Sequence, residues 1–223
     1  DQKGEESEPI RRMINTLKKI LNLDGKALNA VIKRRVESLQ LATERLELKK
    51  TLFADLEQIA GRDAILATNT STLSVTQIAS TVTLAERVVG MHFFNPAPLM
   101  PLVEIIAGAR TASEVVEATL DLTRRIGKTP VRTKDTPGFI VNRVARPFYL
   151  EALRMLNDGI ADQATIDRLV RDGGGFRMGP FELMDLIGLD VNYASSQSVY
   201  EQSFFEPRFR PSLAEEVNEV GVA

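Results

Sequence analysis

Apolar residues recur with helical spacing along the first sixty residues of the chain. One amphipathic helix is predicted over residues 8–23, where Pro9 suits the first turn, and a second over 28–36, beyond a break at Asp24-Gly25. A third is predicted over 44–61 and is stopped by Gly61. The apolar face of this third helix is predicted to consist of Leu48, Leu52, Leu56 and Ile59.

Between residues 64 and 134 the apolar positions form short runs bounded by polar residues, which is typical of buried strands. Strands are predicted over 64–69, 87–94, 101–107 and 129–133. Helices are predicted over 75–80 and 111–127, the second opened by Thr111, with Glu114 three residues on, and closed by Gly127. Strands that alternate with helices indicate an α/β fold with a largely parallel sheet.

Beyond Asp135 the pattern contains no further strand. Residues 135–139, DTPGF, are predicted to form a turn, and helices are predicted over 141–159, 161–173 and 179–200. The chain is therefore predicted to consist of a basic helical segment over 1–41, an α/β half over 42–134 and an all-helical domain over 135–223.

Composition limits the kinds of site that the chain can contain. Among its 223 residues there is no cysteine and one histidine, His92, which excludes disulfides, thiolate catalysis, finger-type zinc sites and a multi-histidine metal site within one chain. No apolar stretch approaches the roughly 20 residues of a membrane helix. The first residues show no signal-peptide pattern, so a cytoplasmic protein that contacts no membrane is expected.

The net charge of −2 conceals a basic region near the beginning of the chain. Residues 10–35 carry eight Lys or Arg side chains against one acid, Asp24. The favoured interpretation is the solvated face of two helices, while contact with an acidic partner or a phosphorylated ligand is an alternative. Nucleic-acid binding is not expected, because no aromatic residue lies among these charges to stack on bases.

Polar residues fall near the ends of the predicted strands, where open α/β sheets bind ligands. They are Asn69, Ser71, His92, Asn95 and Glu104. His92 and Glu104 lie on consecutive strands, so they can meet if those strands are neighbours. A carboxylate on one imidazole nitrogen would leave the other nitrogen to move a proton. From spacing alone, a structural hydrogen bond for this pair and helix caps for Asn69 and Ser71 remain the alternatives.

Four stretches together resemble the 3-hydroxyacyl-CoA dehydrogenase family. They are ATNTSTLSVTQIA, RVVGMHFFNPAPLMPLVEII, GKTPVRTKDTPGFIVNRV and GGGFRMGPFELMDLIGLD, and they occur in the family's order between about residues 42 and 212. VNRVARPFY and DLIGLDVN are most similar to the bacterial enzymes of the 3-hydroxybutyryl-CoA and phenylacetate-degradation type. The resemblance implies a partial Rossmann-like sheet that binds NAD, followed by a helical domain for substrate binding and dimerisation.

The resemblance also implies roles for individual residues. His92 would be the general base, Glu104 would hold and polarise its imidazole, Ser71 would hydrogen-bond the substrate oxygen near the nicotinamide, and Asn142 would position the substrate. Glu44, Lys49 and Asn95 would lie beside the NAD cofactor, and Ser71 would also contact it. The implied reaction is the oxidation of a (3S)-3-hydroxyacyl-CoA to the 3-oxoacyl-CoA by a homodimer, with NAD accepting hydride.

The chain departs from the family at its beginning, where the family has a βαβ unit with a G-x-G-x-x-G motif for the cofactor pyrophosphate. No such motif is present; the one close glycine cluster, at residues 173–175 and 179, has another spacing and follows a predicted helix. Pro101 stands where relatives usually have Lys. Two further hypotheses therefore accompany the enzyme: a non-catalytic relative that binds acyl-CoA or oligomerises, and a partner-binding helical pair over 10–35.

Overall fold

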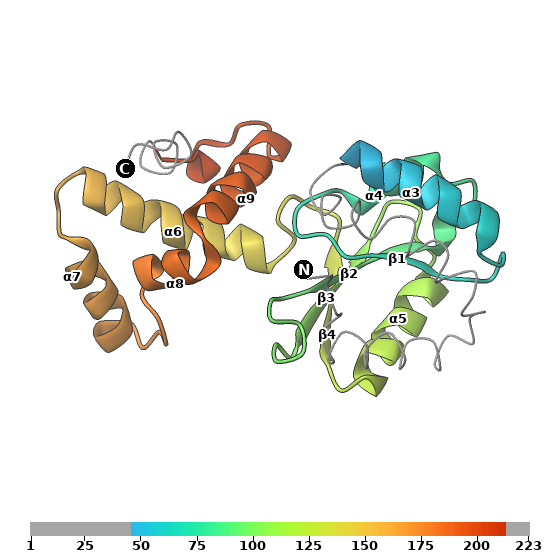
Figure 1. The fold of residues 1–223 in the computed structure, drawn as a ribbon, viewed down its shortest axis with the longest axis horizontal. Helices are drawn as coiled ribbons and strands as arrows, with labels where there is room; N and C mark the ends of the chain where they lie inside the picture. Colours follow the sequence, from blue (N-terminus) through green and yellow to red (C-terminus); the bar gives the residue numbers. More distant parts are fainter. Residues whose placement is uncertain (1–45, 213–223) are drawn as a thin grey trace, which may run out of the picture.

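The computed structural model describes residues 46–212, so the predictions for residues 1–41 and for Glu44 lie outside the described residues. A four-stranded sheet between helices, the sheet half (residues 46–134), is followed by the helical half (residues 135–212) (Figure 1). The two halves lie side by side along the long axis of the molecule and are joined by one segment of chain (Figure 1).

The sheet consists of four strands in the order of the chain: β1 (Leu66–Thr68), β2 (Val88–Phe93), β3 (Leu102–Ala107) and β4 (Thr129–Lys134). β1 pairs with β2 and β3 with β4 in parallel, whereas β2 and β3 pair antiparallel. The predicted α/β fold with a largely parallel sheet is confirmed, and the antiparallel pair makes the sheet mixed.

Helices cover both faces of the sheet. Helices α3 (Leu46–Ile59) and α4 (Val75–Ile78) lie on one face, and α5 (Ser113–Arg125) lies on the other (Figure 1). Short 3-10 turns at Ala79–Thr81 and Ala85–Arg87 lead from α4 into β2. Since successive strand residues point to opposite faces, Val88 packs in the core beneath α3 and α4, while Val89 packs in the core beneath α5.

The predicted apolar face of α3 is partly wrong. Its fully buried residues are Lys49 and Phe53, and Ile59 is 51% exposed. Phe53 packs against strand and α4 residues, and Leu56 joins the same core as predicted. The helix is rotated toward Phe53 because the largest apolar side chain gains most from burial.

The predicted cap of α5 is also wrong. Ala112 occupies the N-cap position and makes no side-chain cap hydrogen bond. The Thr111 hydroxyl instead donates to the Val88 carbonyl at 2.6 Å and accepts from Gly108 N at 2.9 Å, so it joins the end of β3 to the beginning of β2. The predicted close at Gly127 agrees with its left-handed φ of 78° just past the helix.

The helical half contains no strand among its described residues. It consists of α6 (Val141–Asn157), α7 (Gln163–Arg168) with a π-helical turn at Leu169–Gly173, α8 (Pro180–Ile187), α9 (Leu189–Gln202) and a 3-10 turn at Pro207–Phe209. The helix predicted over 179–200 is divided into α8 and α9 by Gly188, whose φ of 98° no helix accommodates. No described helix is long and apolar enough to cross a membrane.

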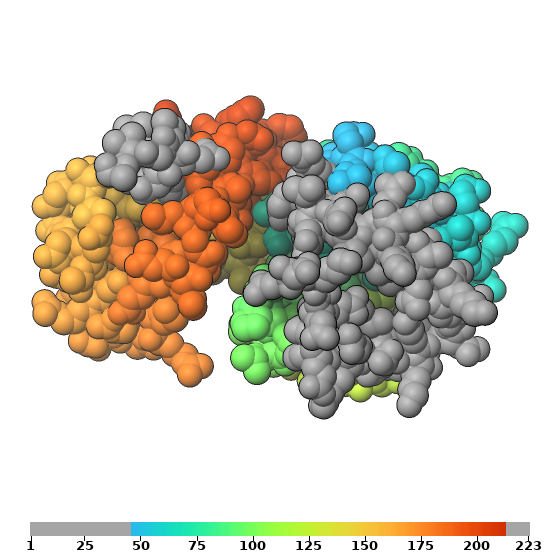
Figure 2. All heavy atoms as spheres, in the orientation of Figure 1, coloured from blue at the N-terminus to red at the C-terminus, as the bar shows by residue number. Residues whose placement is uncertain are grey.

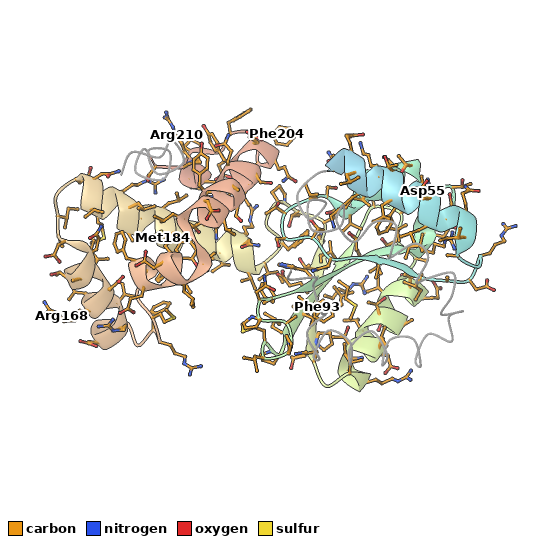
Figure 3. All side chains as sticks on the ribbon, viewed as in Figure 1. Asp55, Phe93, Arg168, Met184, Phe204 and Arg210 are labelled. Atoms are coloured by element: carbon orange, nitrogen blue, oxygen red, sulfur yellow. The ribbon has the colours of Figure 1, made fainter. Side chains whose placement is uncertain are left out.

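A buried arginine joins α6 to α9. Arg146 is 3% exposed, and its Nη1 donates to Asn192 O at 3.0 Å, Asn192 Oδ1 at 2.9 Å and Ser196 Oγ at 3.2 Å. The apolar centre of this half lies nearby, around Met184, which is fully buried (Figure 3). A buried charge with this many acceptors holds the two helices in one relative position.

Candidate active site

The antiparallel pairing of β2 and β3 places His92 directly opposite Glu104. Opposed residues on neighbouring strands have their Cβ atoms about 5 Å apart and point to the same face. His92 Nδ1 lies 2.8 Å from Glu104 Oε2, and the two residues are 3% and 1% exposed. The structure therefore brings together the two residues whose meeting depended on whether their strands were neighbours.

The second oxygen of Glu104 binds the start of a helix in the other half. Glu104 Oε1 accepts from Ile140 N at 2.9 Å and from Val141 N at 3.0 Å, at the N-terminus of α6. The orphan N–H groups and dipole at a helix N-terminus favour a negative charge there. An ionised Glu104 accepts a hydrogen bond from the N–H at His92 Nδ1, and His92 Nε2 is then the ring nitrogen with the free lone pair.

Two phenylalanines surround the imidazole ring. The Phe94 ring centroid lies 4.5 Å from that of His92, and Phe139 meets it edge-on at 5.8 Å. Phe139 is 2% exposed and belongs to the core of the sheet half, although the chain has just left the sheet. These rings keep water from the His92–Glu104 pair and so strengthen its electrostatic interaction.

Residues 135–140, here called the connector, are bound at both ends. At one end Glu104 accepts from Ile140. At the other, Asp135 accepts from Ser74 Oγ at 2.7 Å, Val75 N at 3.0 Å and Thr76 N at 2.7 Å, at the beginning of α4. The sequence predicts Asp135 only as part of a turn, and no local pattern indicates its partners, which lie about sixty residues earlier.

Ser71 and Asn142 meet across the boundary between the halves. Asn142, in the first turn of α6, donates from Nδ2 to the Ser71 carbonyl at 3.2 Å. Ser71 lies in the 69–74 loop, which follows β1. The cap of α4 is Ser74, so Ser71 does not have the capping role that spacing left open. His92, Glu104, Ser71 and Asn142 thus belong to one group around the start of α6.

Asn69 also does not cap a helix, because its Oδ1 accepts from Phe93 N at 3.1 Å and ties the end of β1 to the end of β2. Lys49 reaches the same place from α3. Its Nζ donates to Asn69 O at 2.7 Å and lies 3.4 Å from Thr68 Oγ1, and the residue is 8% exposed. The predicted cofactor-side residue Lys49 therefore lies at the carboxyl end of β1.

Asn95 lies in the loop between β2 and β3 and is exposed. This loop is braced by Lys128, whose Nζ donates to the carbonyls of Ala97 at 2.7 Å, Pro98 at 3.1 Å and Met100 at 2.8 Å. Three acceptors match the three protons of an ammonium group, so Lys128 holds the backbone of the loop. The surface is hollowed between this loop and the helical half (Figure 2), and Phe93 marks the adjacent end of β2 (Figure 3).

Comparison with known proteins identifies the family. A profile described as "3-hydroxyacyl-CoA dehydrogenase, NAD binding domain" matches residues 29–136, and one described as "3-hydroxyacyl-CoA dehydrogenase, C-terminal domain" matches residues 138–222. The mitochondrial hydroxyacyl-coenzyme A dehydrogenase of Rattus norvegicus is 38% identical over 222 residues, which cover 92% of this chain and 70% of that protein. The chain belongs to the 3-hydroxyacyl-CoA dehydrogenase family.

Other members of the 3-hydroxyacyl-CoA dehydrogenase family extend well beyond the matched region. The 3-hydroxyadipyl-CoA dehydrogenase of Escherichia coli K12 is 52% identical over 183 residues, covering 82% of this chain but 38% of that protein. The crystal structure of 3-hydroxybutyryl-CoA dehydrogenase from the same species superposes with a TM-score of 0.79 at 45% identity, covering 97% of this chain and 50% of the other. The predicted family is confirmed, and the chain spans half or less of the length of these two relatives.

Proposed function

We propose that the protein oxidises a (3S)-3-hydroxyacyl-CoA to the 3-oxoacyl-CoA with NAD as the hydride acceptor. The observation that carries the proposal is the buried His92–Glu104 pair, whose carboxylate is anchored on the N-terminus of α6. Among the described residues only Nδ1 of the imidazole is hydrogen-bonded, so Nε2 is available to a substrate. Family membership supports the same reaction.

The proposed proton transfer uses the tautomer described above. His92 Nε2 takes the proton of the substrate hydroxyl as the C–H bond breaks and the carbonyl forms. The resulting imidazolium is stabilised by Glu104, which already accepts from Nδ1 at 2.8 Å. NAD, when bound, supplies the redox chemistry by accepting the hydride. The residues of this chain orient the substrate, move its proton and exclude water.

Ser71 and Asn142 are proposed to hold the oxygen of the substrate. The Ser71 hydroxyl, in the 69–74 loop, would donate a hydrogen bond to the oxygen as it becomes a carbonyl. The amide of Asn142 binds the Ser71 carbonyl at 3.2 Å, and thereby orients the loop while the rest of its side chain positions the substrate. Support comes from the contact between the two residues and from the place of Asn142 directly after Val141, which binds Glu104.

The residues at the sheet edge suit the nicotinamide end of NAD. An ammonium group at Lys49, a hydroxyl at Ser71 and an amide at Asn95 are donors appropriate to ribose hydroxyls and a carboxamide, and Glu44 is proposed to join them. We assign residues 42–134 to cofactor binding and 135–223 to substrate binding and dimerisation. The apolar side chains of Leu186 and Val191, 71% and 51% exposed, support association of the helical half into a homodimer. We assign this homodimer to the cytoplasm.

The exposed apolar side chains of Leu186 and Val191 in the helical half favour one alternative, a non-catalytic relative that binds acyl-CoA or oligomerises without NAD. Such a protein would retain the helical half and its exposed apolar residues. It would not need the open Nε2 of His92.

One set of measurements separates the two functions. NADH formation is followed with 3-hydroxybutyryl-CoA and a longer 3-hydroxyacyl-CoA, NADH binding by fluorescence titration, and oligomeric state by sedimentation. We expect turnover that His92→Gln abolishes while NADH binding persists. No turnover at saturating NAD, with no NADH binding but a concentration-dependent oligomer, would establish the alternative.

A further inference from the structure

Helix α9 contacts the 69–74 loop through a hydroxyl pair. Ser198 Oγ donates to Thr72 Oγ1 at 3.0 Å, across 126 residues of sequence. Thr72 is 1% exposed and directly follows Ser71 in the chain. The helical half therefore touches this loop at two neighbouring residues, through Asn142 on α6 and Ser198 on α9.

The hydroxyl of Ser198 is itself oriented by its own helix. Gln202 Nε2 donates to Ser198 Oγ at 2.8 Å, one helical turn further on. The serine oxygen accepts from Gln202 while its single proton is donated to Thr72 Oγ1, so both bonds use the hydroxyl in different roles.

The residue after Ser198 fixes α9 against the connector. Val199 is fully buried, and a Cβ on Gly138 would lie 3.1 Å from Val199 Cγ2 and 2.9 Å from Arg143 N. Gly138 also has a φ of 72°, which favours glycine. Of these consecutive α9 residues, Ser198 contacts the loop that carries Ser71, and Val199 contacts the connector that leads to Asn142.

The position of α9 is set independently of the loop. Arg146 of α6 binds Asn192 and Ser196, so α9 cannot shift along α6 without breaking buried, charge-assisted hydrogen bonds. The helix therefore offers Ser198 from a rigid support, while the 69–74 loop has no regular structure of its own. The ends of the loop are tied at Asn69 to β2 and at Ser74 to the connector, so its middle, Ser71 and Thr72, is the part that α6 and α9 hold.

We propose that Ser198 is a positioning residue, which acts with Asn142 to hold the 69–74 loop from the helical half. Through this contact, the Ser71 hydroxyl is placed correctly only when the helical half packs against the sheet half. This inference rests on the proposed function for the role of Ser71 in catalysis. The holding of the loop by α9 is a separate statement and has its own measurement.

The experiment compares Ser198→Ala with Ser198→Thr and with a matched control, Ser195→Ala. Ser195 lies on the same helix, and its side chain makes no hydrogen bond among the described residues. We expect Ser198→Ala to speed amide hydrogen exchange in a peptide covering residues 69–74. We also expect it to lower kcat about five-fold, the factor that one neutral hydrogen bond is worth, with KM for the acyl-CoA unchanged. Ser198→Thr should restore both, because it keeps the hydroxyl.

The two readouts distinguish failure of this inference from failure of the proposed function. Exchange over residues 69–74 that is equal in Ser198→Ala and Ser195→Ala overturns the inference, whether or not the wild type turns over. Faster exchange in Ser198→Ala beside an inactive wild type supports the holding role and refutes the proposed dehydrogenase. Faster exchange with an unchanged kcat in an active enzyme overturns the coupling to Ser71.

Discussion

Replacing Glu104 with Gln tests the inferred tautomer of His92. The substitution keeps the size of the side chain but exchanges one acceptor oxygen for an NH2 group that only donates. In the wild type one oxygen accepts from Ile140 N and Val141 N, and the other accepts from His92 Nδ1. If the amide oxygen of Gln stays with the two backbone donors, its NH2 meets Nδ1 and the imidazole proton moves to Nε2.

The size of the expected effect follows from these contacts. A hydrogen bond to a charged group is worth about 1.5–3 kcal/mol, which is about a 10- to 150-fold change in rate. The inverted tautomer adds to this loss, because Nε2 then carries a proton and cannot accept one. The corresponding Asp→Asn change in the Ser-His-Asp triad lowers kcat about 10⁴-fold for that reason. We therefore expect kcat of Glu104→Gln to fall by about 10² to 10⁴.

The single histidine makes the tautomer directly measurable. Because His92 is the only histidine in the chain, nitrogen NMR of imidazole-labelled protein contains one pair of ring signals. In the wild type the neutral imidazole of His92 should carry its proton on Nδ1. In Glu104→Gln the neutral imidazole should carry it on Nε2. The matched control, Glu86→Gln, changes an acid that is 51% exposed and should alter neither the tautomer nor kcat.

A Glu104→Gln protein with the proton still on Nδ1 and kcat within two-fold of the wild type would refute the role of Glu104 in fixing the His92 tautomer. Loss of stability with an unchanged His92 tautomer would also contradict the expected orientation of the amide introduced by Glu104→Gln. In that case the amide oxygen faces His92, and the two backbone N–H groups at the start of α6 have lost their acceptor at a cost of about 1–3 kcal/mol.

Three further predictions concern stability, measured as the free energy of unfolding in urea. Asp135→Asn should destabilise by about 2 kcal/mol, because an amide oxygen cannot accept from all three donors that the carboxylate binds. Phe139→Ala should destabilise by about 3 kcal/mol, because the ring is buried in the core of the sheet half. Backbone hydrogen bonds from Leu84 and Thr83, with Arg87 nearby, hold the pKa of Glu57 below its ordinary value of 4.5. The stabilisation from ionised Glu57 is complete above pH 4.5 and is lost as the pH falls through the lowered pKa. Glu57→Gln should therefore reduce the loss of unfolding free energy at acid pH.

Each of these predictions has its own contradicting result. An Asp135→Asn protein as stable as the wild type would mean that the carboxylate does not hold the connector. For Phe139→Ala the control is Phe204→Ala, which also alters a phenylalanine of positive φ but one that is 94% exposed; equal losses in the two would contradict a burial effect. If the free energy of unfolding of Glu57→Gln and of the wild type changes with pH in the same way, the lowered pKa of Glu57 does not contribute to stability.

The strands and most helices were predictable because their signals are local. Each strand in the sheet half lies within or beside a predicted range, since a buried strand needs a short apolar run whatever its neighbours are. The antiparallel partner of β2 was not predictable, because pairing depends on how the chain folds back between Phe93 and Leu102. The meeting of His92 and Glu104 therefore needed the structure.

The contacts that the sequence did not indicate join residues far apart in the chain. Asp135 and Glu104 both bind the beginnings of helices, but from elements 59 to 61 and 36 to 37 residues away, so no capping pattern marks them. Thr111 has the local pattern of a cap, yet its hydroxyl is used between strands, where it satisfies a buried carbonyl. Local patterns predict which residues can cap a helix, and tertiary contacts decide which of them do so.

The register of β2 and β3 has a consequence for how such sites vary among relatives. His92 faces Glu104 because the two residues occupy opposed positions in one hairpin. Of the chain between them, the part after Phe93 and before Leu102 is loop, and the rest belongs to the two strands. Lengthening that loop would leave the two side chains opposed, whereas deleting one residue inside either strand would turn its member of the pair to the other face. A search for this chemistry in distant sequences should therefore fix the strand positions and leave the length between them free.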